Sequence, residues 1–128
     1  MINNITLKIN EDAVMCAIRP YIVVNLRWEG VHNWPGCDLP SVLFLRDPHR
    51  HVFHIEIGKP VSHGDRDIEI IIFKRAVLSC LDAHFPDRDM GSLSCEQLAE
   101  FLLKEFGAKW VKVLEDGENG AEVRAEVL

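Results

Sequence analysis

The stretch DPHRHVFHIEI, residues 47–57, contains three histidines within six positions. Side chains at positions i and i+2 of a β-strand share a face, so His49 and His51 point the same way and His54 points the other way. An H-x-H pair on a strand can bind a metal ion through both imidazoles. Catalytic zinc needs a third protein ligand and keeps a fourth position open. His32, at the end of the preceding predicted strand, is the expected third ligand.

The same histidines also fit a chain that binds no metal. Strand histidines are often exposed or hydrogen-bonded, and H-x-H arises by chance in many sequences. In that interpretation the chain is a structural oligomer whose imidazoles have no catalytic role. His54 and His63 are expected to be structural or solvated under either interpretation.

Two long strands are predicted to position these residues. β-branched and aromatic residues are frequent in residues 21–31 and predict one strand, and alternation over residues 49–61 predicts the second. Prolines and glycine predict a loop over residues 33–41, and residues 41–45 either extend this loop or form a short strand. Alternation over residues 5–9 predicts a further short strand.

Two helices and a hairpin follow. Phe73, Val77 and Leu81 share one helical face and predict a helix over about residues 70–84. Ser94 and Gln97 form a capping box that starts a second helix, which Gly107 ends. The apolar stripe of this second helix is Leu98, Phe101, Leu102 and Phe106. Strands are then predicted at residues 109–115 and 121–128, around the turn DGENG.

Composition limits the function classes. The chain has 128 residues, 48% of them hydrophobic, which suits one domain over residues 1–128 with its own core. A formal net charge of −6 argues against a nucleic-acid partner, which needs a basic face. The longest apolar run, IEIIIF, is too short to span a membrane. The four cysteines form no C-x-x-C pair and no signal peptide is evident, so we expect a reducing, cytoplasmic setting without disulfides.

Five segments, taken in order, resemble one protein family. They are WEGVHNWP, PHRHVFHIEI, LDAHF, SCEQLAEFLL and VKVLEDGENGAEV, within residues 21–125. They are similar to the F-x-A-x-H, H-G-H, Asp-His, P-T-x-E-x-L-A and V-x-V-x-E motifs of the 6-pyruvoyltetrahydropterin and 6-carboxytetrahydropterin synthases. The resemblance implies an α+β tunnelling fold, with a four-stranded antiparallel sheet and two helices on one of its faces. It also implies a homo-oligomeric barrel, a hexamer or a tetramer, with active sites between subunits.

The resemblance also implies roles for individual residues. His32, His49 and His51 match the family's Zn²⁺ ligands. Glu115 matches the glutamate that anchors the pterin ring, because a carboxylate can accept two hydrogen bonds from an amino-pyrimidinone edge. Without the family, Glu115 would be interpreted as a turn-side acid in an acidic hairpin. Glu96 retains the acid of the helix-start motif and is the second expected substrate-binding residue.

The expected proton-transfer residues depart from the family pattern. The family has a cysteine four residues before the H-G-H histidine, and here that position is Leu45. Cys37, in the predicted loop, is the substitute candidate, although it could equally be a buried loop residue. The family's Asp-His pair is interrupted by Ala83. Cys37, Asp82 and His84 are therefore the predicted catalytic residues.

Two arginines have other expected roles. Arg50 stands where the family has glycine, and its expected role is structural pairing with Asp47 or Glu69. Arg66 is expected either to form a salt-bridged turn or to bind a substrate phosphate, which suits a guanidinium.

Beside the structural oligomer that binds no metal, two functions remain open at this point. The first is a zinc-dependent lyase that acts on a reduced pterin triphosphate such as dihydroneopterin triphosphate. The alternative is a protein of the same fold that binds a pterin, a purine or a nucleotide and catalyses nothing. Either function needs a small-molecule partner, and neither needs a nucleic acid or a membrane.

Overall fold

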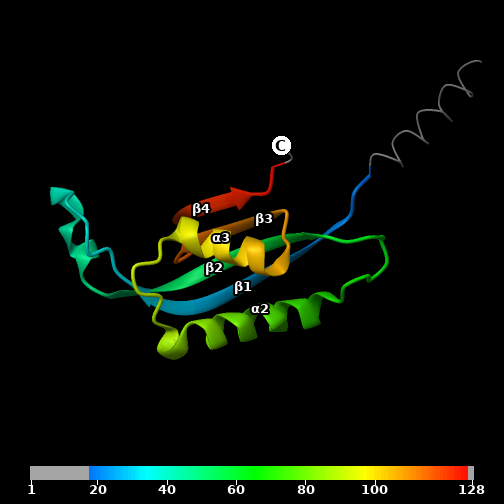
Figure 1. Ribbon diagram of the computed structural model, residues 1–128, viewed down its shortest axis with the longest axis horizontal. Coiled ribbons are helices and arrows are strands. Elements are labelled where there is room, and N and C mark those ends of the chain that lie inside the picture. Colours follow the sequence, from blue (N-terminus) through cyan, green and yellow to red (C-terminus); the bar gives the residue numbers. More distant parts are fainter. Residues whose placement is uncertain (1–17, 127–128) are drawn as a thin grey trace, which may run out of the picture.

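A computed structural model describes residues 18–126 as an α+β unit built on an open four-stranded antiparallel sheet (Figure 1). The strands follow the order β1-β2-β3-β4, so each strand pairs with its neighbours in sequence. The elements are β1 (Tyr21–His32), η1 (Pro40–Arg46), β2 (His49–Pro60), α2 (Ile70–His84), η2 (Pro86–Arg88), α3 (Cys95–Phe106), β3 (Trp110–Glu115) and β4 (Asn119–Arg124). The predicted four-stranded sheet is thus confirmed.

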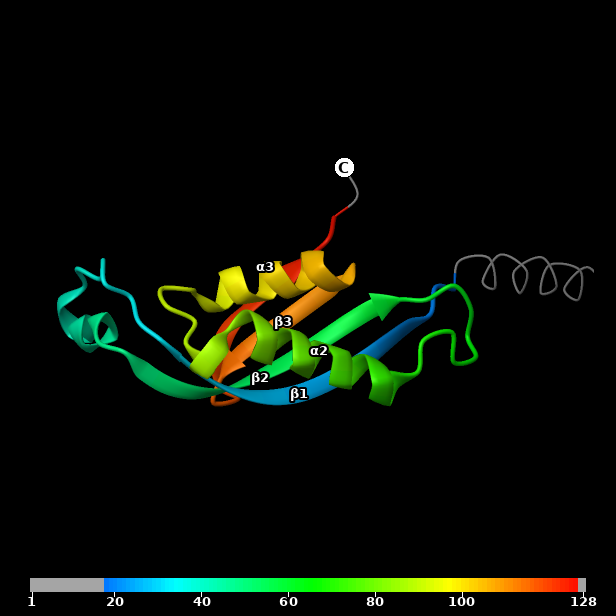
Figure 2. The same ribbon diagram turned by 60° about the horizontal axis from the view of Figure 1, so that its bottom comes forward.

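Both α-helices cover the same face of the sheet, and the core lies between them and the strands (Figure 2). Alternate residues of β2 and β3 face the helices, for example Phe53 and Val113, which are fully buried. The predicted face of α2, formed by Phe73, Val77 and Leu81, is buried against them. The opposite face of the sheet carries no helix from the described part of the chain.

The predicted helix boundaries are confirmed. α2 covers residues 70–84, as the periodicity predicts. The Ser94 side chain accepts the Gln97 backbone N–H, and the Gln97 side chain accepts the Ser94 backbone N–H, which completes the predicted capping box at the start of α3. Gly107 ends α3 in the left-handed region, with φ of 59°. α3 therefore starts at a fixed position, close to the ends of the strands.

The short strand considered for residues 41–45 is wrong. These residues lie in the 3₁₀ segment η1. Their backbone groups close the loop on itself, because the Val42 N–H donates to the Leu39 carbonyl and the Leu45 carbonyl accepts from the Trp34 N–H. Groups used in this way cannot pair with a sheet.

The last strand is shifted from its predicted place. β4 pairs from Asn119 opposite Glu115, so the turn is only three residues long and the strand begins two residues earlier than predicted. Residues 127–128 lie outside the described part, as does the strand predicted for residues 5–9. Among residues 18–126, no helix combines the length and apolar character needed to cross a membrane.

Candidate metal centre

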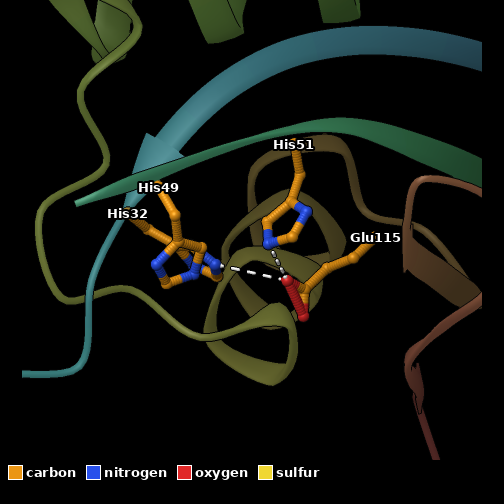
Figure 3. A group of neighbouring side chains, drawn as sticks. All are labelled: His32, His49, His51 and Glu115. Carbon is orange, nitrogen blue, oxygen red and sulfur yellow. Dashed lines mark ion pairs between the residues drawn. The ribbon is translucent and has the colours of Figure 1, made fainter. Parts of the chain in front are cut away.

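The pairing of β1 with β2 brings two of the predicted ligands together. His32 and His49 are direct partners at the end of the β1–β2 ladder. His51, two positions further along β2, faces the same way and lies opposite Gly30. Glu115 ends β3, on the other side of β2. Figure 3 shows these side chains, from three strands, turned toward one region.

The four side chains form a group that could hold a metal ion. Each of His32, His49, His51 and Glu115 offers one ligand atom, and these atoms lie within 4.8 Å of one another. His32 is buried and the other three are half-buried. The three histidines that the sequence predicts as a group are thus brought together. Glu115, which the resemblance assigns to the pterin ring, lies in the same group.

Backbone carbonyls fix the orientation of two of the rings. The Nδ1 atom of His32 lies 2.8 Å from the carbonyl oxygen of Leu93, and that of His49 lies 2.8 Å from the carbonyl oxygen of Asp47. A carbonyl can only accept, so each Nδ1 carries the proton and donates it. Each Nε2 then keeps its lone pair for a ligand, which is the usual arrangement of metal-binding histidines.

The third ring lies between two carboxylates. The Nδ1 of His51 is 2.7 Å from Oδ2 of Asp116, and its Nε2 is 2.6 Å from Oε2 of Glu115. The other Asp116 oxygen accepts the backbone N–H of Val52. The hydrogen bond from His51 and then that from Val52 lower the pKa of the Asp116 carboxyl. A doubly protonated ring can donate to both acids, and a bound cation would replace the proton on Nε2.

The spacing of the group suits a small divalent ion. Tetrahedral zinc with bonds of about 2.0–2.1 Å to nitrogen separates its ligand atoms by about 3.3 Å. The Nε2 of His32 lies 3.4 Å from Oε2 of Glu115, close to this value. The 2.6 Å contact between His51 and Glu115 is shorter, so this pair must separate to admit an ion. The residues present therefore fit a metal ion, with a modest adjustment of Glu115.

A cavity of about 1030 Å³ opens beside the group. His32, His49 and Glu115 line it, and so do Leu45 and Glu96. The resemblance concerns two of these lining residues. It makes Glu96 the second expected substrate-binding residue, and Leu45 stands at the position that corresponds to the family's cysteine. The cavity is large enough for a drug-sized ligand, for which about 300–1,000 Å³ is typical.

Cys95 also lines this cavity, and sequence reasoning did not select it. It is the first residue of α3 and is buried. Burial, followed by the neighbouring carboxylates of Glu115 and Glu96, raises the pKa of its thiol to about 12. The thiol donates a hydrogen bond to Glu115 and stays protonated at neutral pH. Cys95 precedes Glu96 in the helix-start motif, and this position is the one sequence feature that could have predicted its place beside the cavity.

The three predicted catalytic residues do not line the cavity beside the histidines and make other contacts. Cys37 is fully buried in the loop before η1, and its Sγ lies 3.6 Å from the carbonyl oxygen of Val42. Asp82 accepts a hydrogen bond from the indole N–H of Trp28. His84 stacks on a phenylalanine of α3 at 4.3 Å between ring centroids. None of the three lines the cavity beside the histidines.

The two arginines make local ion pairs. Arg50 lies 3.7 Å from Glu29 on β1, and neither Asp47 nor Glu69, its expected partners, is within ion-pair distance. The expected partners are wrong because the β1–β2 register pairs Arg50 with Val31, which places Glu29, two positions along β1, diagonally opposite Arg50 on the outer face. Arg66 pairs with the adjacent Asp65 in an exposed turn, at 2.6 Å.

Comparison with known proteins adds no assignment to this geometry. No protein-family model matches the chain, and no curated protein matches it significantly.

Proposed function

We propose that the chain is a zinc-dependent enzyme of the 6-pyruvoyltetrahydropterin synthase type, a carbon–oxygen lyase acting on a reduced pterin triphosphate. The observation that carries the proposal is the convergence of three imidazoles and one carboxylate beside a large cavity. The five collinear motifs supply the substrate class. Three imidazole nitrogens with a fourth position left open are typical of catalytic zinc.

The protein groups have distinct roles in this proposal. His32, His49 and His51 hold the ion, which when bound polarises the substrate's side-chain oxygens and acidifies neighbouring protons. Glu115 accepts hydrogen bonds from the pterin ring, so its carboxylate turns from the histidines toward the cavity when the ligand enters. Glu96, on the cavity wall at the start of α3, accepts further hydrogen bonds from the substrate.

Elemental analysis tests the metal. Protein purified without a His tag is expected to contain about one zinc per chain, because the three histidines form one site. His49→Ala should lose this zinc. His54→Ala is the matched control, because it removes an imidazole from the same strand but from the opposite face, and it should keep the zinc. Equal zinc in both variants would contradict the site.

Incubation with dihydroneopterin triphosphate tests the reaction. Zinc-loaded protein should release 6-pyruvoyl- or 6-carboxytetrahydropterin, detected by chromatography, and His49→Ala should release neither. Absence of both products, with zinc bound to the protein, would exclude the proposed lyase activity.

Glu115→Gln separates the anchoring role from metal binding. The amide keeps the size of the side chain but accepts through one oxygen only. If Glu115 anchors the ring, the variant should keep its zinc and lose affinity for a reduced pterin, measured by fluorescence titration. Loss of zinc with unchanged pterin affinity would instead make Glu115 a fourth ligand of a closed site.

A second function, binding without catalysis, is favoured by one observation. Leu45 lines the cavity at the place of the family's cysteine, while Cys37, Asp82 and His84 do not line it. Under this alternative a pterin or purine binds, and Cys37→Ala leaves its affinity unchanged. A large loss of turnover in Cys37→Ala would exclude it.

We further propose that the chain assembles into a homo-oligomeric barrel of four or six copies. The outer edges of β1 and β4 pair with no other strand of residues 18–126, and exposed edges of this length favour pairing with another chain. Light scattering should give a mass four or six times that of the 14.6 kDa chain. A monomeric mass at micromolar concentration would contradict the assembly.

A further inference from the structure

A second cavity, of about 600 Å³, is lined mainly by the face of the sheet that carries no helix. Three neighbouring strands and α2 contribute to it. The charged and hydrogen-bonding side chains on its wall are Asn25, Arg27, His54, Glu56, Lys74 and Lys112. Three permanent cations thus face one carboxylate, in a chain whose formal net charge is −6.

None of the three cations forms an ion pair within residues 18–126. The side chains of Arg27, Lys74 and Lys112 make no hydrogen bond or ion pair with any of residues 18–126. In contrast, most other arginines of the described chain have a hydrogen-bond or ion-pair partner. Arg124, for example, pairs with a glutamate. Unpaired cations that share a concave surface create a local positive potential.

Lys112 shows why this potential persists. Its partners across the sheet are Glu56 on β2 and Glu122 on β4, two acids well placed to pair with it. Glu56 instead accepts the indole N–H of Trp110 at 2.9 Å, and Glu122 accepts the guanidinium of Arg124 at 2.8 Å. Each acid holds another donor and neither pairs with Lys112, so the Lys112 ammonium can contact a ligand.

We propose that this cavity binds a small anion carrying two or more phosphate groups. A guanidinium binds phosphate oxygens in pairs, and lysine ammonium groups add point charges from other sides. His54 is the Cα partner of Arg27 and offers an imidazole N–H between the strands. The formal net charge of −6 disfavours a long nucleic acid, whereas a compact anion meets only the local cations.

This anion site is separate from the metal centre. His54 is on the opposite face of β2 from His49 and His51. No residue lines both cavities. The inference therefore does not depend on the proposed zinc chemistry and can fail without affecting it.

Pyrophosphate is the probe for the anion site. We expect saturable binding at low ionic strength, with amide shifts in an NMR titration concentrated at residues 25–27, 54–56 and 112–117. The double variant Arg27→Gln/Lys112→Gln should weaken binding at least about tenfold, since two charge-assisted contacts are lost. Raising the salt to about 0.5 M should weaken wild-type binding strongly, since exposed charges are screened.

Matched control variants distinguish binding at a specific anion site from a general effect of the protein's net charge. Arg88→Gln/Lys104→Gln removes the same two charges from side chains that pair elsewhere, with Glu29 and Glu100, and should bind pyrophosphate like the wild type. The His49→Ala variant should also bind normally. Thermal unfolding confirms that each variant folds. Equal weakening in both double variants, or shifts scattered over the whole chain, would overturn the proposal.

Discussion

The hydrogen bond between His51 and Asp116 gives the sharpest prediction. Asp116→Asn is expected to reduce zinc affinity while keeping the turn intact. Asp116 has a φ of 55°, in the left-handed region that asparagine also tolerates. The two carboxylate oxygens are bound separately, one to the His51 ring and one to the Val52 N–H. An amide has only one oxygen, so it can satisfy only one of these two donors.

The expected loss follows from the tautomer of His51. If the amide oxygen stays on Val52, the amide NH₂ faces Nδ1 and favours the ring form with its proton on Nε2. That form has no lone pair for the metal. Loss of such a supporting acceptor typically reduces metal affinity about 10–100-fold, which corresponds to about 1.4–2.7 kcal/mol. If the oxygen turns to His51 instead, the Val52 N–H loses its partner and the turn becomes less stable.

Competition with a chromophoric zinc chelator at pH 7.5 measures this affinity. Asp65→Asn is the matched control, because it makes the same chemical change in an exposed turn away from the histidines. Thermal unfolding of both variants separates a loss of affinity from a loss of fold. A zinc affinity and a thermal stability of Asp116→Asn equal to those of Asp65→Asn and the wild type would show that the Asp116 carboxylate supports neither His51 nor Val52.

Three further predictions concern stability and reactivity. Gly120→Ala should destabilise by about 1–3 kcal/mol in urea unfolding, because an added Cβ would lie 1.8 Å from the Val113 carbonyl oxygen; Gly64→Ala, with open space, should cost under about 0.5 kcal/mol. Hydrogen bonds from the backbone and side chain of Ser62 lower the pKa of Asp67, so their stabilisation is lost as the pH falls through the folded-state pKa. The urea midpoints of wild type and Asp67→Asn should therefore converge below about pH 4. Cys95, buried with a pKa of about 12, should resist iodoacetamide at pH 8 in native protein and react in urea, as mass spectrometry can show.

Local periodicity predicted which face each strand residue occupies. The rule that alternate residues share a face placed His49 with His51 and His54 opposite, and the structure agrees. His32 could be added because two strands joined by one loop pair antiparallel, which puts the end of the first beside the start of the second. These inferences need only neighbours in sequence or consecutive strands, and for that reason they succeed.

Contacts between distant elements could not be predicted in the same way. Cys37 is close to His32 in sequence, but its loop buries the side chain against the Val42 carbonyl. Cys95 is far away in sequence, yet the start of α3 lies over the strand ends and brings it to the cavity. Asp116 reaches His51 only through the β2–β3 register and a left-handed turn residue. No residue type or spacing in the chain encodes these placements by itself.

The orientation of His32 depends on the loop before α3, so residues that are not metal ligands also shape the site. The Met90 N–H donates to the Val31 carbonyl at 2.8 Å, so the segment before α3 docks onto the end of β1. This docking positions the Leu93 carbonyl to accept Nδ1–H of His32. A carbonyl acceptor belongs to the backbone, and a side-chain substitution cannot remove it. Metal affinity at His32 should therefore respond to changes that displace this loop, even where no ligand is altered.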